Sequence, residues 1–443
     1  MYHIFELQVI RYKLQETMRI AILGGGFAGL SAAHYLQKKN HDITLFERDT
    51  HLGGLAGGFK KEGWDWYLEK TYHHWFSNDY DILNFAKEVG FTDILFDEPL
   101  TSSFYSVQNK ASFIPLDTPF DLLRFPLLSL PVKIRVGLVL AFLKVSPFFT
   151  AYERQTAEEM LEKSMGKRAW DVLWSQLFRK KFGKYAGNIL MSFFWSRIKK
   201  RTKRLGYPRG GYQTFLNHIE SVLSKNKVEV KTSTPVESVE QSGKRFKLNI
   251  INSKAQIFDA VVSTLPTPIL IKVAGQVFSQ KYMTRLSSLK YLHAINVIFR
   301  TTEPVLKNIY WLNVIEKTNP IMVAVQHTNF INSSHYHNEH ILYVGNYLEG
   351  SHELFKMRED EIGDHYKKNL HTINPSFDFS RSQFSVGRGA FAQPIFDKEF
   401  VKNKPDFETP VKNFYIANLD MTYPHDRGTN YAVALGRKVS GFF

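Results

Sequence analysis

Cysteine does not occur anywhere in the 443 residues of this chain. Its absence excludes structural disulfides, thiolate metal sites and a dithiol redox relay, because each of these needs a thiol sulfur. A cofactor tethered through a cysteine is excluded for the same reason. Nothing in the sequence favours secretion, so we expect a cytoplasmic protein.

Long apolar runs are missing as well. No stretch reaches the ~20 consecutive apolar residues that a helix needs to span a bilayer. Residues 1–17, which precede Met18, lack the uninterrupted apolar core of a signal peptide. We interpret residues 1–17 as an extension outside the fold, or as the product of an upstream start codon.

Acidic residues are in the minority, since 57 lysines and arginines against 42 aspartates and glutamates give a formal net charge of +15. Such an excess suits nucleic acid, anionic lipid or an acidic substrate. One dense basic stretch, residues 197–204 (RIKKRTKR), is either a solvated face or a contact with an anion or a membrane. Because no nucleic-acid-binding motif is present, we expect no nucleic-acid partner.

The length favours two domains, and the abundance of Phe and Tyr allows a large core and a large pocket. Residues 119–149 are strongly apolar but are interrupted by prolines and basic residues. Two interpretations are open for this segment: an amphipathic segment in peripheral contact with a membrane, or a pair of buried helices in a substrate domain. The oligomeric state is left open.

A βαβ unit is predicted close to the start of the chain. Residues 18–23 and 42–46 are short apolar runs typical of buried parallel strands, and residues 27–39 between them have helical spacing. The whole unit has the length expected of the motif. Farther along, strands are predicted near residues 228–232, 236–239, 246–251 and 260–264, and the chain ends with a strand at 414–417 and a helix from about 430.

The turn between the first strand and helix reads GGGFAG. Gly24 permits the tight turn, Gly26 lets a pyrophosphate approach the backbone, and Gly29 lets the helix pack closely on the strand. The helix begins at Phe27 and Ala28, where free N–H groups would face the phosphates.

Glu47 stands at the end of the second predicted strand, where a carboxylate would accept a hydrogen bond from a ribose hydroxyl. Arg48 follows it and is included in the predicted site. Strand, helix, second strand and terminal acid agree, so the unit predicts a dinucleotide-binding site.

A second glycine loop, HLGGLAGGF at residues 51–59, follows directly. Gly53, Gly54 and Leu55 are placed to reach the pyrophosphate and the reactive ring of the cofactor, and a plain NAD-binding domain needs no such loop. With this loop the chain resembles the superfamily of flavin-dependent amine oxidases, protoporphyrinogen oxidase and phytoene desaturase. The resemblance implies bound FAD and an α/β fold: a Rossmann-like, glutathione-reductase-like FAD-binding domain with an inserted mixed α+β substrate domain.

Later segments match the same superfamily. Val236 occupies the position whose backbone usually meets the adenine. The C-terminal stretch FYIANLDMTYPHDRGTNYAVALG resembles the flavin motif, in which a strand, a loop and a helix N-terminus approach the pyrimidine edge of the flavin. The resemblance therefore adds Arg427, Thr429, Asn430 and Tyr431 to the cofactor site.

The C-terminal motif also departs from the superfamily. A Gly-Asp pair usually follows the strand, whereas this chain has Ala417-Asn418-Leu419-Asp420. Either Asn418 or Asp420 takes the polar role toward the cofactor, or that contact is missing.

The resemblance also divides the chain into domains. Residues 18–78, 203–265 and 382–443 are expected to form the FAD-binding domain. Residues 79–202 and 266–381 are expected to form the substrate domain, which includes the helical segment 119–149.

Candidate catalytic residues follow from their distance to these motifs. His73 and His74 come about 20 residues after the double glycine, so they could line the flavin and shuttle a proton, or they could simply be aromatic pocket residues. Tyr423 lies in the loop before the last helix, where it would line the pocket. The histidines at 335, 337 and 340 lack a carboxylate or cysteine frame, so no metal site is predicted.

The favoured function is an FAD-dependent oxidoreductase that transfers hydride between flavin N5 and a bulky or lipid-like small molecule. The alternative is a flavin-dependent nucleotide-sugar isomerase resembling UDP-galactopyranose mutase, in which Arg209, Arg388 and Arg427 would hold a pyrophosphate. A third possibility is a flavoprotein without catalytic activity. With only one dinucleotide fingerprint, reductases that bind two dinucleotides are disfavoured.

Overall fold

The computed structural model describes residues 17–107 and 110–443. The predicted extension, residues 1–17, lies outside the described residues except for its last residue. Within the described part, no helix is both long enough and apolar enough to cross a membrane.

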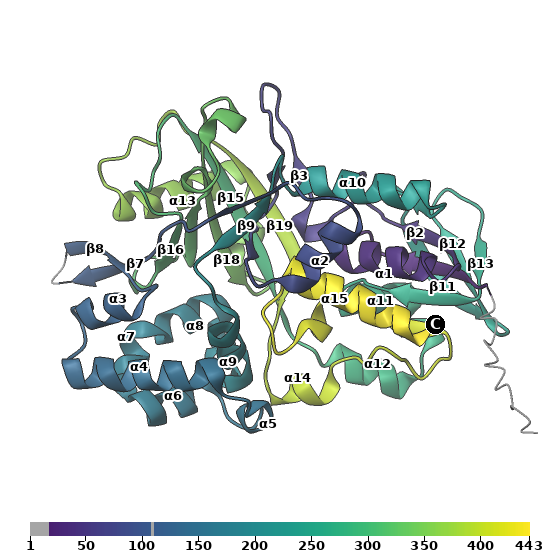
Figure 1. Ribbon diagram of the computed structural model, residues 1–443, viewed down its shortest axis with the longest axis horizontal. Helices are drawn as coiled ribbons and strands as arrows, with labels where there is room; N and C mark the ends of the chain where they lie inside the picture. Colours follow the sequence, from purple (N-terminus) through teal and green to yellow (C-terminus); the bar gives the residue numbers. More distant parts are fainter. Residues whose placement is uncertain (1–16, 108–109) are drawn as a thin grey trace, which may run out of the picture.

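A five-stranded parallel sheet forms one half of the molecule, on the right in Figure 1. The strand order is β10-β2-β1-β14-β20, and every neighbouring pair is parallel. The strands are β1 (Arg19–Leu23), β2 (Asp42–Phe46), β10 (Glu229–Lys231), β14 (Ala260–Ser263) and β20 (Phe414–Ile416).

The two faces of this sheet are covered differently. Along β1, Ile20 and Ile22 enter a core shared with helices, whereas Ala21 and Leu23 enter a core shared with a small antiparallel sheet. This alternation follows from the two-residue period of a strand. The helices on the first face are α1 (Phe27–Gln37), α10 (Tyr212–Lys225) and α15 (Thr429–Val439), with α2 (Tyr80–Glu88) against α15. The second face carries β11 (Val236–Ser242), β12 (Arg245–Ile250), β13 (Gln256–Phe258), α11 (Thr267–Ala274) and α12 (Gln280–Ser287).

The other half is built on a seven-stranded sheet of order β19-β15-β18-β17-β16-β7-β8, at the upper left of Figure 1. Neighbouring strands are antiparallel except for the pair β16 and β7. The strands are β7 (Thr101–Val107), β8 (Lys110–Pro115), β15 (Tyr291–Thr301), β16 (Trp311–Val314), β17 (Val323–Gln326), β18 (His340–Leu348) and β19 (Gln383–Pro394).

A group of helices lies below this sheet in Figure 1. Its members are α3 (Pro119–Arg124), α4 (Leu130–Val145), α5 (Phe149–Tyr152), α6 (Ala157–Met165), α7 (Lys167–Leu173), α8 (Ser175–Phe182) and α9 (Met191–Lys200). Two further helices, α13 (Glu359–Ile373) and α14 (Lys398–Asn403), follow later in the chain.

Two small sheets lie where the halves meet. One pairs β3 (Gly58–Phe59) with β4 (Leu68–Glu69), and the other has the order β5-β9-β6. The strands of the second are β5 (Trp75–Phe76), β6 (Ile94–Asp97) and β9 (Leu205–Pro208). Both sheets involve the chain around residues 68–76, which leads from the second glycine loop toward the seven-stranded sheet.

The predicted α/β fold, with a parallel-sheet domain and a mixed α+β part, is confirmed. Several elements lie differently from the predicted domain ranges, among them α12, which falls within 266–381 but lies on the second face of the parallel sheet. Strand β19, within 382–443, pairs with β15 in the seven-stranded sheet. Helices α11 and α2, within ranges predicted for the substrate domain, pack on β11 and on α15 respectively. Sheet partners are set by distant segments, so local patterns do not reveal them.

Candidate functional site: the glycine turns and the α15 loop

The first glycine turn has the geometry that its sequence predicts. Gly24 has a φ of +106°, and its N–H donates to the carbonyl of Phe46 at 2.9 Å. A Cβ added at Gly29 would lie 2.0 Å from the carbonyl oxygen of Gly24, so only glycine permits this approach of α1 to the turn. These two glycines fix the position of the helix start.

Gly26 differs because a Cβ added there would meet no atom within 4 Å. It is the N-cap residue of α1, has no side-chain cap, and is followed by a first turn without acidic residues. The helix therefore begins, at Phe27 and Ala28, with amide groups free of any capping side chain. Such amides, together with the helix dipole, form an anion-binding site.

Glu47 lies at the rim of this turn. Its Oε2 accepts a hydrogen bond from the Gly25 N–H at 2.8 Å, and its Oε1 accepts one from the Asp49 N–H at 2.9 Å. Each oxygen retains a lone pair for a further donor such as a hydroxyl group. Arg48 points into solvent instead, with its side chain 72% exposed and its Nε 3.4 Å from a carboxylate oxygen of Asp49.

Val236, the residue expected to face the adenine, lies close to Glu47 in the fold. The Thr234 N–H donates to the carbonyl of Glu47 at 2.8 Å, and Val236 begins β11 two residues later. The structure thus brings Glu47 and Val236 to the same end of the parallel sheet.

The second glycine loop docks directly onto the first. The Gly53 N–H donates to the Gly25 carbonyl at 2.9 Å, and an added Cβ at Gly54 would lie 3.7 Å from the Cα of Gly26. Gly53 and Gly54 both have positive φ angles, of +117° and +56°. Leu55 comes next, is 42% exposed, and lies beside Gly389 of β19. The uncovered backbone at Gly26 is therefore bordered by both the first glycine turn and the second glycine loop.

The loop after β20 contains the departure from the superfamily. Asn418 is buried and donates through Nδ2 to the Leu265 carbonyl at 3.0 Å and to the Thr267 hydroxyl at 2.9 Å. Asp420 is buried as well, and its Oδ2 accepts hydrogen bonds from the hydroxyls of Thr267 at 2.5 Å and Tyr291 at 2.8 Å. Both residues hold the loop in place.

Asp420 retains one unused oxygen. Among the described residues, its buried Oδ1 has no hydrogen-bond partner. Burial raises the pKa of this carboxyl to about 6. An orphaned buried acceptor at a predicted cofactor residue fits a hydroxyl group supplied by a ligand.

The start of α15 is anchored to the segment around residues 75–82. The Trp75 Nε1–H donates to the Thr429 hydroxyl at 3.0 Å, and the Ile82 N–H donates to the Asn430 side-chain oxygen at 3.0 Å. Tyr431 stacks on His425 with ring centroids 4.4 Å apart. No side chain caps this N-terminus, whose N-cap residue is Gly428.

Arg427 lies between the C-terminal loop and the seven-stranded sheet. Its guanidinium donates to the Ala392 carbonyl at 2.9 Å and lies 4.5 Å from the centre of the Tyr347 ring. The neighbouring Asp426 accepts from the Lys181 ammonium at 2.5 Å and also from Arg197. Two cations therefore share one carboxylate, with the Arg427 guanidinium close to Lys181, and burial lowers the pKa of Lys181 to about 7.

Residues 69–74 cross the junction of the two halves. The Lys70 N–H donates to the Gly57 carbonyl at 3.1 Å, whereas the Lys70 carbonyl accepts from the Asn296 amide at 2.8 Å. The Thr71 hydroxyl donates to the Leu55 carbonyl at 2.9 Å. This segment is thus bonded to the second glycine loop on one side and to the seven-stranded sheet on the other.

Both candidate histidines belong to this segment. His73 Nδ1 lies 2.7 Å from the Thr71 carbonyl, which can only accept, so Nδ1 carries the proton. Burial lowers the pKa of His73 to about 4 and that of His74 to about 3. His74 Nδ1 lies 3.0 Å from the Tyr310 hydroxyl. Both rings are therefore neutral near pH 7, and the acceptor nitrogen of His73 is Nε2.

Tyr423 lies apart from the two histidines. Its hydroxyl pairs with the Ser192 hydroxyl of α9 at 2.6 Å, and its ring packs on Phe396 and Phe400. None of the contacts described joins Tyr423 to His73 or His74. The structure places the Tyr423 side chain against helices α9 and α14.

Two residues of the 69–74 segment were missed by sequence reasoning. Glu69 is completely buried, and its carboxylate accepts from the Tyr207 hydroxyl at 2.8 Å and from the Tyr212 N–H at 2.8 Å. Burial raises the pKa of Glu69 to about 7. Lys70, in contrast, has an exposed side chain. The available sequence signal was the position of Glu69, an acidic residue three positions before the aromatic run that begins at Tyr72.

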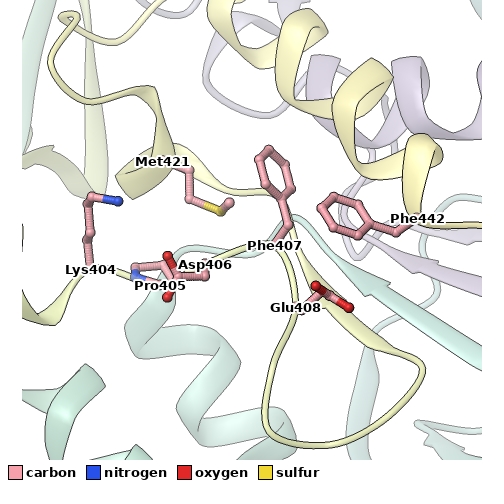
Figure 2. Close-up of a pocket in the computed structure, with 7 residues that line it drawn as sticks. All are labelled: Lys404, Pro405, Asp406, Phe407, Glu408, Met421 and Phe442. Atoms are coloured by element: carbon pink, nitrogen blue, oxygen red, sulfur yellow. The ribbon is translucent and has the colours of Figure 1, made fainter.

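A surface hollow of about 320 Å³ lies elsewhere, beside the chain terminus (Figure 2). The rings of Phe407 and Phe442 form one side of it, with centroids 5.5 Å apart, and Met421 lines it as well. None of the predicted site residues lines this hollow. The two glycine turns therefore remain the candidate site.

The glycine turns fit a dinucleotide. A backbone cradle at Gly26 stays open where a Cβ would intrude, the start of α1 is uncapped, and the Glu47 carboxylate stands at the rim. Asp420 adds an unsatisfied buried oxygen on the C-terminal side. An anion-binding helix start and hydroxyl-binding carboxylates are the groups that the pyrophosphate and ribose of FAD require.

The chain has relatives among known proteins. Coproporphyrinogen III oxidase of Staphylococcus aureus is 25% identical over 295 residues, which are 59% of this chain and 63% of that protein. The 15-cis-phytoene desaturase of Synechococcus elongatus is 36% identical over 97 residues, 20% of each chain. The matches thus span less than two thirds of these relatives.

The fold has close counterparts among solved structures. A protein from Exiguobacterium sp. 255-15, assigned as a protoporphyrinogen oxidase, superposes with a TM-score of 0.75 at 15% identity. The superposition covers 97% of this chain and 99% of that one. Residues 27–439 match the family described as flavin containing amine oxidoreductase. The chain therefore belongs to this family of FAD-dependent oxidoreductases, and its cofactor is FAD.

Proposed function

We propose that this protein dehydrogenates a bulky, largely apolar small molecule, with the substrate held between the second glycine loop and the seven-stranded sheet. Bound FAD supplies the acceptor for a hydride equivalent. The observation that carries the proposal is the 69–74 segment, which is bonded to the second glycine loop through Lys70 and Thr71 and to the sheet through Asn296. Substrate bound along this segment would lie beside the cofactor.

His73 supports a proton-accepting role. Because its Nδ1–H is committed to the Thr71 carbonyl, its Nε2 lone pair is available. A pKa of about 4 makes the ring a weak base that stays neutral near pH 7. We infer that His73 accepts or orients a proton that the substrate releases while hydride leaves it.

Aromatic side chains support a bulky apolar substrate. The Tyr72 ring lies 5.2 Å from Trp311 and 6.1 Å from Tyr343, measured between centroids, so the segment faces an aromatic surface of the sheet. The relatives named for coproporphyrinogen III and 15-cis-phytoene act on large molecules with extended carbon frameworks. Lipid-like compounds and porphyrinogens are therefore the first classes to test.

The cationic cluster supports a polar end on that substrate. Lys181 and Arg197 both pair with the Asp426 carboxylate, whereas the Arg427 guanidinium is held by the Ala392 carbonyl and the Tyr347 ring. Three basic side chains around a single carboxylate favour an anionic group nearby. A carboxylate at one end of the substrate would supply it.

The test is anaerobic bleaching of the flavin. Purified protein is mixed without oxygen with porphyrinogens, polyprenoids, amines and nucleotide sugars, and the flavin absorbance is followed. Bleaching by a porphyrinogen or a polyprenoid is expected, and His73→Gln should slow it by about tenfold or more without releasing FAD. Absence of flavin from the denatured protein would overturn the proposal, and bound FAD that no compound bleaches would indicate a flavoprotein without catalytic activity.

The nucleotide-sugar isomerase alternative gains nothing from the structure. Of the three arginines it requires, Arg209 pairs with Asp93 at 3.1 Å and Arg388 with Glu359 at 3.5 Å. The comparisons do not support it either. Turnover of a UDP-sugar only after dithionite reduction would favour it over the dehydrogenase.

A further inference from the structure

One surface of the helical region is unusually apolar. Among the described residues, fourteen large hydrophobic side chains are exposed, and eight of these lie between residues 120 and 148. The eight are Phe120, Leu123, Leu130, Ile134, Leu138, Phe142, Val145 and Phe148. Such a concentration exceeds the single exposed apolar residues that are normal on soluble proteins.

Five of them form one stripe along α4, which we call the α4 stripe: Leu130, Ile134, Leu138, Phe142 and Val145. With about 3.6 residues per turn, spacings of four and three place them on one face. Their exposure ranges from 49% at Phe142 to 75% at Val145. The opposite face is buried through Val136 and Leu143, so α4 is packed on one side and bare on the other.

Basic side chains flank the stripe. Arg135 donates to the backbone carbonyls of Lys163 and Ser164, and Lys133 donates to that of Leu123. The Lys144 ammonium donates to the carbonyls of Ile198 and Arg201 at 3.1 and 2.7 Å. These bonds are to neutral carbonyls, so the positive charges of the three flanking residues are not neutralised by them.

The last of these contacts brings a further basic segment close to the stripe. Ile198 and Arg201 belong to the stretch 197–204, which contains six basic residues and no acidic one. One acidic residue lies beside this stretch: Asp117, whose carboxylate pairs with Arg201 at 2.7 Å. The apolar stripe thus has a rim that is predominantly cationic.

We propose that the α4 stripe, with Phe120, Leu123 and Phe148 beside it, docks onto a lipid bilayer that contains anionic headgroups. The apolar side chains would enter the acyl boundary while the basic rim contacts the headgroups, as in amphipathic helices that lie in the membrane plane. A second copy of this chain is a poorer occupant, because two such faces would bring like-charged rims together.

The orientation of α4 relative to the membrane follows from the length of the helix and its packing. The 16 residues of α4 extend about 24 Å, and the helix is fixed along its length by buried side chains, so it lies along the surface. This inference goes beyond the proposed oxidation and does not depend on it. A membrane-docked enzyme would, however, receive a lipid-like substrate from the same bilayer.

The absence of cysteine allows a direct test by single-site labelling. Leu138→Cys in the stripe and Ile251→Cys, in the turn directly after β12, are each labelled with an environment-sensitive fluorophore. Ile251 is the matched control, because it is also an exposed aliphatic residue, at 46%, and it lies in the other half of the molecule. The flavin-loaded proteins are titrated with phosphatidylcholine vesicles, with and without phosphatidylglycerol.

With anionic vesicles, the fluorescence emission of the label at 138 is expected to shift to the blue and to increase in intensity, whereas the emission of the label at 251 is unchanged. The change at 138 should be smaller at high salt. In vesicle flotation, Leu138→Gln combined with Phe142→Gln should weaken binding by about tenfold or more. An unchanged label at 138, or equal binding by the double variant, would overturn the proposal. So would a dimer in the absence of vesicles that the double variant abolishes, because the stripe would then be covered by a second copy.

Discussion

Gly26 and Gly29 stand in the same turn, but an added methyl group would meet different surroundings at each. At Gly26 it would lie in open space, and the φ of −76° suits an alanine, whereas at Gly29 it would lie 2.0 Å from a carbonyl oxygen. We therefore expect Gly26→Ala to fold with a loss of about 1 kcal/mol and to bind FAD at least tenfold more weakly. Gly29→Ala should fail to fold or unfold far more readily.

Calorimetry of the apoproteins and titration with FAD distinguish these outcomes. Full FAD affinity in Gly26→Ala would show that the pyrophosphate does not approach the backbone at this residue.

Glu69 provides a pH-dependent term in stability. Burial raises its pKa from 4.5 to about 7, so between these values the folded state holds a proton that the unfolded state has lost. Stability contributed by this group is therefore present below about pH 4.5 and declines as the pH rises toward 7, by up to about 3 kcal/mol.

A glutamine can mimic the protonated acid toward Tyr207 and the Tyr212 amide. We expect Glu69→Gln to gain stability relative to the unmodified protein as the pH rises from 5 to 8. Urea unfolding at several pH values measures this difference, and parallel pH profiles for the two proteins would contradict it.

At the scale of elements, helices α1 and α15 pack closely because α15 has a glycine, Gly436, where it meets α1. A Cβ added at Gly436 would lie 2.3 Å from the Ala28 carbonyl oxygen, and the Ser31 hydroxyl donates to the Val433 carbonyl at 2.8 Å. The packing of these two helices fixes two uncapped helix starts, at Gly26 and Gly428. Spreading the helices would therefore disturb both ends of the candidate cofactor site.

Gly436→Ala is expected to lower the free energy of unfolding by about 2 kcal/mol and to weaken FAD binding severalfold. Gly441→Ala is the control, because an added Cβ there meets no atom within 4 Å. Equal thermal stability and equal FAD affinity in the two variants would show that the helices yield without moving the site.

Local elements could be predicted where local pattern suffices. The strands at 19–23 and 42–46, the helix from Phe27 and the final helix from Thr429 all agree with the sequence. The membership of β19 in the second sheet could not be predicted, because its partner β15 lies about 90 residues earlier in the chain. Likewise, only the fold of residues 71–73 shows that the Thr71 carbonyl is the hydrogen-bond acceptor for the His73 Nδ1 proton.

At the scale of the whole molecule, the candidate cofactor site joins segments from both ends of the described chain. The first glycine turn begins at Gly24, whereas the C-terminal contribution runs from Asn418 to the start of α15. A ligand bound across them stabilises the folded state by mass action. We expect FAD at 100 times its dissociation constant to raise the free energy of unfolding by about 2.7 kcal/mol.

Thermal unfolding of apoprotein across a series of FAD concentrations measures this linkage. The midpoint should rise steadily with free FAD and should not respond to riboflavin, which lacks the pyrophosphate and adenine. A midpoint independent of FAD would mean that the cofactor binds the unfolded chain equally well, or does not bind these segments.

The segment 69–74 acts as a seam between the two halves. On one side, Lys70 and Thr71 donate hydrogen bonds to the second glycine loop. On the other side, Asn296 and Tyr343 of the seven-stranded sheet donate to the backbone carbonyls of this segment. Each such bond contributes about 1 kcal/mol, so opening along this line is costly. We therefore expect residues 69–74 to stay bonded to both halves when a large substrate enters, so that their backbone amides are among the slowest to exchange with solvent deuterium.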